Sequence, residues 1–439
     1  MRPRPVPSIL LGLLSLLCLS VATPARADVV RLAAPEPGDL LSAGFRVEAA
    51  GEVEIAAVGL RQKFAGSDAV RAWLLRRGDD TPVWFQDPEA GEPVGASRLL
   101  RRGSARVRLE PGDYVLYLAA GRGSRAGKAF HQWRSVLNDL ADLLNREDPR
   151  ARPGDYFGKC EASVAPYGSL VLLPPAPPPP AWPVVVRPDA AHLATVPFRL
   201  TRTARLTVVV TGEAGEDGDR ALDYGWIEDA RTGRTVWTAE DATPRPAGNA
   251  AVNVRWGDSL ALNAGDYLAG FLSDAVHGPG DWHDLPPYDP EAWGLRLMPV
   301  AADVGVMTVA PADVAVARSP ELLVRLVRPG NDAVLREEFS LARASRLRVR
   351  CLGEGGRKMF DYGSLTDLGS ERVVWTMTAA ASRSAGGAGK NLLFDGEIEL
   401  PAGRYLATFV TDGSHACGDW NATPPTGAQD YGLTVRLLP

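Results

Sequence analysis

The sequence contains few cysteines and few histidines, and it has no excess of basic residues. Only four cysteines and five histidines occur among 439 residues, so the chain is not a scaffold built from disulfides. Acidic residues outnumber basic ones by 53 to 48, which gives a formal net charge of −5. Nucleic-acid binders need a basic footprint, so this balance excludes a general nucleic-acid-binding protein.

The motifs of the common enzyme classes are also missing. The sequence contains no His-Glu-x-x-His, no Gly-x-Ser-x-Gly, no Walker loop and no dinucleotide fingerprint. Ser414 and His415 are neighbours in the chain, but adjacency does not make a nucleophile face its base. We therefore expect a protein that is not an enzyme.

Long apolar runs are limited to the leader. Two arginines precede the apolar stretch 9–19, which is too short to span a bilayer comfortably, and a small-x-small pattern predicts cleavage after Ala27. Residues 1–27 are thus expected to be a signal peptide, and the mature protein is expected in the periplasm or outside the cell. No later segment has about 18 uninterrupted apolar residues, so no transmembrane segment is expected in the mature chain.

Glycine and proline are abundant, at 45 and 36 residues, which suits many short strands joined by tight turns. Three stretches of the chain also align with one another. Each has a phenylalanine eight residues before an alternating apolar run, then a Val-Trp pair, then a Gly-x-Tyr turn whose tyrosine follows the tryptophan by 30 residues. The markers are Phe45, Trp84 and Tyr114, then Phe198, Trp237 and Tyr267, then Phe339, Trp375 and Tyr405.

This repeat predicts an all-β chain made of three tandem antiparallel β-sandwich modules. We place the modules at 28–174, 184–300 and 318–439. The proline-rich segment 175–183 is expected to be a stiff polyproline II linker, and 301–317 a second linker.

The first copy contains an insertion with helical periodicity. Apolar residues recur along one face over about 128–144, which predicts an amphipathic helix. We expect this helix to pack on its own sandwich, and a docking helix for a partner is the alternative. The face consists of Phe130, Trp133, Leu137, Leu140 and Leu144.

A loop shared by the second and third copies is the strongest candidate for a functional site. It places two aspartates, a histidine and a tryptophan at matching positions, and long loops of this kind commonly carry function. Tryptophan beside Asp and His suits stacking and hydrogen bonding with a glycan or protein ligand. The residues are Asp274, His277, Asp281 and Trp282 in the second copy, and Asp412, His415, Asp419 and Trp420 in the third.

Two other interpretations of these loops stay open. The aspartates Asp274, Asp281, Asp412 and Asp419 are candidate metal ligands, for calcium through oxygens or for zinc with the histidines. Alternatively, the polar side chains cap turns while each tryptophan forms a small core of its loop. No other cofactor is expected.

Two further pairs of residues lead to structural predictions. Asp223 and Asp361 each begin an Asp-Tyr-Gly sequence, which we interpret as an Asx-turn. Cys351 and Cys417 occur only in the third copy, and two cysteines gained together in an oxidising compartment predict a disulfide.

The order of these features resembles the bacterial pre-peptidase C-terminal type of β-sandwich domain. The shared pattern is Phe-x-Leu, Leu-x-Val, a strand and turn with Val-Trp, and Leu-x-x-Gly-x-Tyr, repeated over nearly the whole mature chain. The resemblance implies a secreted, non-catalytic, jelly-roll-like domain that is sometimes calcium-dependent and typically accompanies an enzyme. No enzyme domain is present here, which favours a freestanding binding or structural protein.

Taken together, these features predict an exported, non-catalytic protein that binds a glycan or protein ligand through the Asp/His/Trp loops. Two copies of the loop favour binding, because avidity rewards paired weak sites. The alternatives are a secreted hydrolase that acts on glycans or peptides through the same loops, and a purely structural spacer.

Overall fold

The computed structural model describes residues 29–61, 69–87, 90–95, 97, 99–121, 154–175, 182–187, 193–215, 221–273, 277–282, 284–303, 305–309 and 318–439. The expected signal peptide, the predicted helix over 128–144 and most of the proline-rich linker lie outside these residues. Within them every strand pairing is antiparallel, and the only α-helix is α2 (Gly154–Phe157). The prediction of an all-β fold of antiparallel sheets is confirmed.

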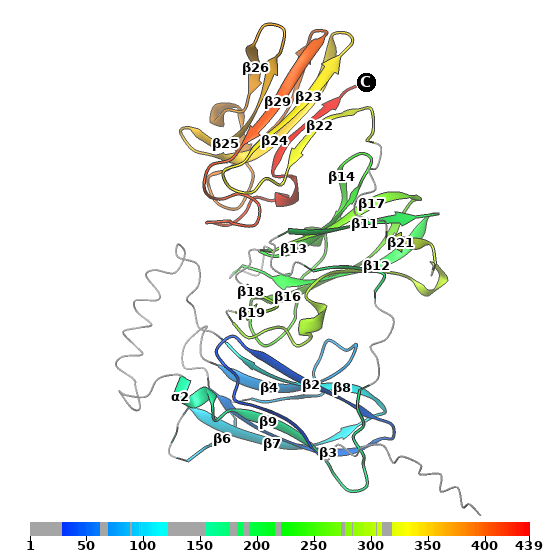
Figure 1. Ribbon diagram of the computed structural model, residues 1–439, viewed down its shortest axis with the longest axis vertical. Coiled ribbons are helices and arrows are strands. Elements are labelled where there is room, and N and C mark those ends of the chain that lie inside the picture. Colours follow the sequence, from blue (N-terminus) through cyan, green and yellow to red (C-terminus); the bar gives the residue numbers. More distant parts are fainter. Residues whose placement is uncertain are drawn as a thin grey trace, which may run out of the picture.

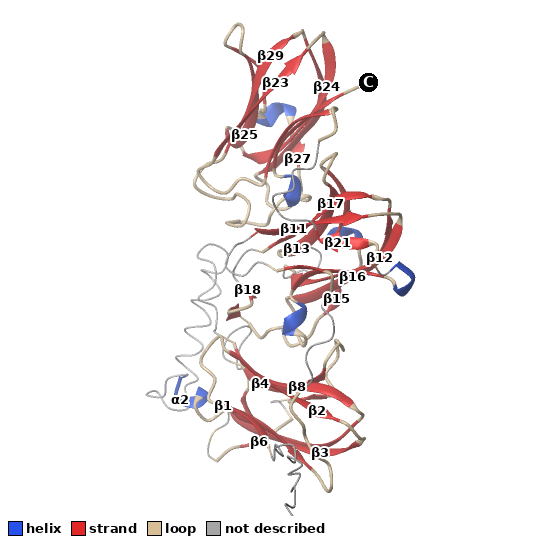
Figure 2. Ribbon diagram, turned by 45° about the vertical axis from the view of Figure 1, so that its right-hand side comes forward, coloured by secondary structure: helices blue, strands red, loops and turns tan. Residues whose placement is uncertain are grey.

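The sheets form in three consecutive stretches of the chain, which follow one another along the long axis of the molecule (Figure 1, Figure 2). We call them the N-terminal unit (30–173), the middle unit (184–309) and the C-terminal unit (322–437). Each unit encloses its own cluster of buried apolar side chains.

The N-terminal unit is a nine-stranded sheet system with the order β1-β9-β3-β4-β8-β2, in which β7 also pairs with β3. The short strands β5 and β6 extend it at β4 and β7. Its strands are β1 (Val30–Ala33), β2 (Leu40–Val47), β3 (Gly51–Leu60), β4 (Val70–Arg76), β5 (Trp84–Phe85), β6 (Glu92–Pro93), β7 (Leu100–Leu109), β8 (Gly112–Ala120) and β9 (Glu161–Pro166).

The middle unit has two five-stranded sheets, β10-β20-β12-β16-β15 and β14-β13-β17-β11-β21, and a small hairpin, β18-β19. Its strands are β10 (Val184–Val186), β11 (Leu193–Leu200), β12 (Ala204–Glu213), β13 (Tyr224–Asp229), β14 (Arg234–Thr238), β15 (Arg245–Pro246), β16 (Asn253–Leu262), β17 (Gly265–Leu272), β18 (His277–Gly278), β19 (Asp281–Trp282), β20 (Gly294–Pro299) and β21 (Met307–Val309). Its 3-10 turns are Ala239–Asp241, Pro290–Ala292 and Ala301–Asp303.

The C-terminal unit repeats the strand order of the first, as β22-β30-β24-β25-β29-β23. Its strands are β22 (Leu322–Val327), β23 (Val334–Leu341), β24 (Ser345–Gly355), β25 (Met359–Asp367), β26 (Arg372–Thr376), β27 (Arg383–Ser384), β28 (Asn391–Leu400), β29 (Gly403–Val410) and β30 (Gly432–Leu437). Its 3-10 turns are Ala379–Ala381 and Ala428–Asp430.

The residues that marked the repeat occupy matching places in the three units. Each phenylalanine is paired across two strands with the tyrosine of the Gly-x-Tyr turn, and the two rings stack at 5.7, 5.4 and 5.3 Å in chain order. Each tyrosine hydroxyl donates to the backbone carbonyl four residues before it. The expected equivalence of Trp84, Trp237 and Trp375 is confirmed, because they pair with Leu74, Ile227 and Leu365 at one register position.

The predicted disulfide between Cys351 and Cys417 is wrong, since both thiols are free. Cys351 lies on β24 with its side chain in the core, directly against Gly363 of the facing strand. Cys417 lies in the loop after β29, where its Sγ contacts the carbonyl oxygen of Ala428 at 3.7 Å. The two side chains thus serve different packing sites, and burial raises the pKa of the Cys417 thiol to about 12.

Candidate functional site

The two shared loops lie at matching places, between β17 and β20 in the middle unit and between β29 and β30 in the C-terminal unit. Asp274 lies outside the described residues, as does the side chain of Asp281. In the C-terminal loop Asp412 is half-buried, and Asp419 is exposed and accepts a hydrogen bond from Asn331 at 2.7 Å. The loop aspartates of that unit therefore do not converge on one point.

A buried asparagine ties the loop of the middle unit to its sheet. Nε2 of His277 lies 2.8 Å from Oδ1 of Asn253, on β16. The amide nitrogen of Asn253 donates to the backbone carbonyls of Gly248 and Leu285, each at 2.8 Å. Because the amide nitrogen serves both carbonyls, the amide oxygen is the acceptor and His277 donates from Nε2.

The C-terminal loop repeats this network atom for atom. Nε2 of His415 lies 2.6 Å from Oδ1 of Asn391, and Nδ2 of Asn391 donates to the carbonyls of Gly386 and Thr423, each at 2.9 Å. Burial lowers the pKa of His415 to about 4, and the nearby charge of Lys390 acts in the same direction. His415 is therefore neutral at pH 7 and acts as a structural hydrogen-bond donor.

The tryptophans of the loops pack edge-on against these histidines. The ring centroids of His277 and Trp282 are 4.9 Å apart, and those of His415 and Trp420 are 5.0 Å apart. Both histidines are fully buried and Trp282 is only 2% exposed, whereas Trp420 is partly exposed. Stacking on a sugar needs an open ring face, which Trp282 does not offer.

Replacement of Asn391 by alanine is expected to lower the free energy of unfolding by about 2–4 kcal/mol. The substitution removes three hydrogen bonds and leaves His415 and two backbone carbonyls without their buried partner. Urea denaturation followed by tryptophan fluorescence measures the change. Thr426→Ala is the control, because Thr426 lies in the same loop but is exposed; equal losses in the two variants would contradict the structural role of Asn391.

The loop of the middle unit also packs on the N-terminal unit. Leu285, only 2% exposed, belongs to a buried apolar cluster with Trp73 and Tyr117 on β4 and β8. Nε1 of Trp73 donates to the carbonyl oxygen of Tyr288 at 2.8 Å. The ring of Tyr288 meets Phe85 edge-on at 5.7 Å. This loop is therefore a docking element between two units.

The loop of the C-terminal unit packs on the middle unit in the same manner. Ala428 belongs to the apolar cluster that forms the core of the middle unit, and Trp420 packs against the same cluster. Beside them Glu228 of β13 is buried and accepts from both Arg325, at 2.8 Å, and Arg328, at 2.9 Å. The guanidinium of Arg328 also lies 5.4 Å from the ring centre of a buried tryptophan, Trp226.

The receiving faces occupy the same position in their units. Strand registers align Trp73 with Trp226 and with Ser364. Each of the two tryptophans contacts the next unit, Trp73 through Tyr288 and Trp226 through Arg328. Tyr117, which stacks on Trp73 at 5.1 Å, aligns with Gly270 and Thr408. The two faces that receive a loop thus carry an indole, and the matching face of the C-terminal unit carries two small polar side chains.

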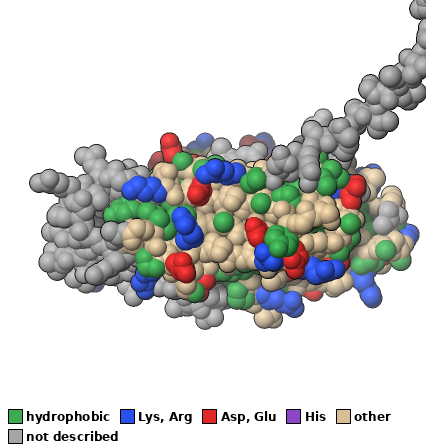
Figure 3. Space-filling view, turned by 90° about the horizontal axis from the view of Figure 1, so that it is seen from below, with side chains coloured by type: hydrophobic (Ala, Val, Ile, Leu, Met, Phe, Trp, Pro, Cys, Tyr) green, Lys and Arg blue, Asp and Glu red, His purple; other side chains and the backbone are tan. Residues whose placement is uncertain are grey.

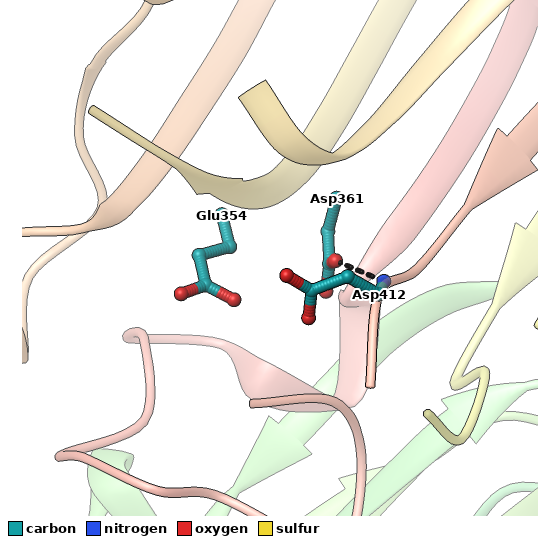
Figure 4. A group of neighbouring side chains, drawn as sticks. All are labelled: Glu354, Asp361 and Asp412. Carbon is teal, nitrogen blue, oxygen red and sulfur yellow. Dashed lines mark hydrogen bonds between the residues drawn. The ribbon is translucent and has the colours of Figure 1, made fainter. Parts of the chain in front are cut away.

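Three carboxylates gather beside the C-terminal loop (Figure 4). Ligand oxygens of Glu354, Asp361 and Asp412 all lie within 4.8 Å of one another, and the first two side chains are buried. Asp361 accepts from the backbone N–H of Asp412 at 2.8 Å and from the hydroxyl of Tyr431 at 2.6 Å. Glu354 pairs through Oε1 with Lys390 at 2.8 Å, and its buried Oε2 has no hydrogen-bond partner.

Sequence reasoning found only Asp412 of this cluster. It assigned Asp361 to an Asx-turn, whereas Asp361 is fully buried and accepts bonds from other parts of the unit. The sequence contained a signal for Glu354 and Asp361. The second copy has the same residue types, Glu213 and Asp223, at the matching positions. Both are buried, and acidic residues retained at buried strand positions call for a specific partner.

On the end of the molecule formed by the N-terminal unit, basic, acidic and apolar side chains are interspersed (Figure 3). Among the described residues there is also no helix with the length and apolarity required to cross a membrane.

Comparison with known protein families gives no match to this chain. Comparison with characterised proteins likewise finds no protein similar to it.

Proposed function

We propose that this protein is an exported, non-catalytic structural protein, in which three tandem β-sandwich modules of the pre-peptidase C-terminal type dock into a stiff rod. The observation that carries the proposal is that each of the two shared loops packs on the preceding unit. Their histidines and Trp282 are buried within the loops, and the loop tips pack on the preceding unit. The features that mark the loops in the sequence are thereby explained without a ligand.

The chemistry of the two junctions supports a stiff arrangement. Units joined only by a linker are expected to move, unless their interface is large and apolar. Here Trp73 and Leu285 are almost fully buried between the first two units, and burial of each such side chain contributes about 1.5–3 kcal/mol. Between the middle and C-terminal units, the side chains of Glu228, Arg325 and Arg328 are at most 12% exposed.

Hydrogen–deuterium exchange on the chain from Asp28 tests the docking role of the loops. Peptides that cover 284–293 and 423–431 are expected to exchange as slowly as the core strands, because the loop backbone is held by buried partners. Rapid exchange in both loops would contradict the proposal. The signal peptide is tested separately by export of the full chain with residues 1–27, since amino-terminal sequencing of the exported protein should begin at Asp28.

A binding role at the C-terminal loop is the second candidate, and one observation favours it. Asp419 is exposed and Trp420 keeps part of its indole in solvent, so a ligand could reach both. A screen of the exported protein against glycan and peptidoglycan arrays distinguishes the two functions. A ligand whose binding is lost in Trp420→Ala, with an unchanged melting temperature, would favour the binding role.

A further inference from the structure

We propose that Glu354, Asp361 and Asp412 form a calcium site at the loop end of the C-terminal unit. The proposal goes beyond the structural function and does not depend on it. Two strands and a loop bring the three carboxylates together: Glu354 from β24, Asp361 from β25, and Asp412 from the residues that follow β29. Figure 4 shows the side chains of the three residues turned toward one space.

The orphaned oxygen of Glu354 points to a missing partner. Glu354 is 5% exposed, and its Oε2 is buried without a hydrogen bond, while Oε1 is held by Lys390. An ionised carboxylate oxygen without a partner is costly inside a protein. A cation in the space shared with Asp361 and Asp412 would supply that partner and leave the pair with Lys390 intact.

The charges of the cluster favour a divalent ion. The cluster has three carboxylates, and the ammonium of Lys390 is the one positive charge that pairs with them. Two negative charges therefore have no ion-pair partner among the described residues. Like charges this close repel one another, so the cluster is unfavourable unless a cation binds.

The ligand set favours calcium over zinc or magnesium. All candidate ligands are oxygens, and His415, the nearby histidine, donates its Nε2 proton to Asn391 and stays out of the cluster. Calcium takes oxygen ligands at about 2.3–2.6 Å, so oxygens on opposite sides of the ion are about 5 Å apart. Atoms that lie within 4.8 Å of one another can therefore share one calcium ion. Magnesium demands a near-ideal octahedron with several waters, which a carboxylate cluster with two buried members accommodates less well.

The middle unit provides independent support. Glu213 and Asp223 occupy the positions of Glu354 and Asp361, and both are buried to the same degree as their counterparts. Tyr431, whose hydroxyl bonds to Asp361, is replaced there by Trp293. The carboxylates are retained although a neighbour that donates to one of them is not, which indicates that the acidic pair itself is required.

Calorimetric titration of the chelator-treated chain from Asp28 with calcium chloride tests the site. Calcium is expected to bind and to raise the melting temperature, and Asp412→Asn is expected to remove one bound ion per chain. Terbium should also bind, and its emission should be excited through the neighbouring rings, because Trp420 lies 5.1 Å from Tyr431, which contacts Asp361. Asp419→Asn, an exposed change in the same loop, is the control and should bind as the wild type does.

Loss of calcium binding can be distinguished from loss of stability, because Asp412→Asn removes a charge without removing volume. Without calcium this variant is expected to melt no lower than the wild type, since it relieves repulsion among the carboxylates. Absence of calcium binding in the wild type, an equal number of ions bound by Asp412→Asn, or an equal affinity for magnesium would overturn the proposal.

Discussion

Glu228→Ala is expected to lower the free energy of unfolding by about 3–5 kcal/mol, because removal of one partner from a buried ion pair leaves the other charges uncompensated. Glu228 is 5% exposed and holds both Arg325 and Arg328 at the junction of the middle and C-terminal units. Burial already lowers the pKa of Arg325, and the charge of Glu228 opposes that effect. Urea denaturation at pH 7 measures the loss.

The control for this prediction is a similar ion pair on the surface. Glu338 and Arg404 lie 2.9 Å apart, but their side chains are 56% and 70% exposed. Glu338→Ala should change the free energy of unfolding by at most about 1 kcal/mol, because solvent screens exposed pairs. Similar losses in Glu228→Ala and Glu338→Ala would show that the junction pair is not buried in solution.

Trp73→Ala is expected to cost about 3–5 kcal/mol and to loosen the junction between the N-terminal and middle units. The indole is fully buried, stacks on Tyr117 at 5.1 Å and donates to the carbonyl of Tyr288. Loss of a buried tryptophan leaves a large cavity, and the carbonyl of Tyr288 loses its donor. Thermal unfolding with limited proteolysis measures both effects, and cleavage between the units should become faster.

Two further variants separate the contributions of Trp73. Trp73→Phe keeps an aromatic ring against Tyr117 and Leu285 but removes the N–H donor, so it should cost less than the alanine change. Ser364→Ala alters the matching position of the C-terminal unit, on which none of the loops described in the structure docks, and should be nearly neutral. Faster cleavage between the first two units in Ser364→Ala would mean that the effect is not specific to the junction.

The sequence was sufficient to predict the strands and their equivalence, because period-2 alternation and turn residues are local signals. The phenylalanines, tryptophans and tyrosines of the repeat were aligned by spacing alone, and each set lies at one register position. The same reasoning located the two shared loops. It could not tell what the loops contact, because docking on a preceding unit depends on the relative placement of units rather than on local pattern.

The disulfide prediction fails for a related reason. The prediction rested on the presence of both Cys351 and Cys417 in one copy only. That observation does not show in which direction either side chain points. Residues on one strand alternate between faces, and Cys351 falls on the face that packs against Gly363 in the core. Cys417 falls in the loop after β29, where its Sγ contacts the carbonyl oxygen of Ala428 in the same loop.

Small-angle X-ray scattering of the chain from Asp28 tests the central claim most directly. If the loops dock the three units into one stiff rod, a single elongated conformation should reproduce the scattering curve, and Glu228→Ala should require a broader set of conformations. The account would be contradicted if the wild-type curve could be reproduced only by units that move independently, with no difference between the wild type and Glu228→Ala.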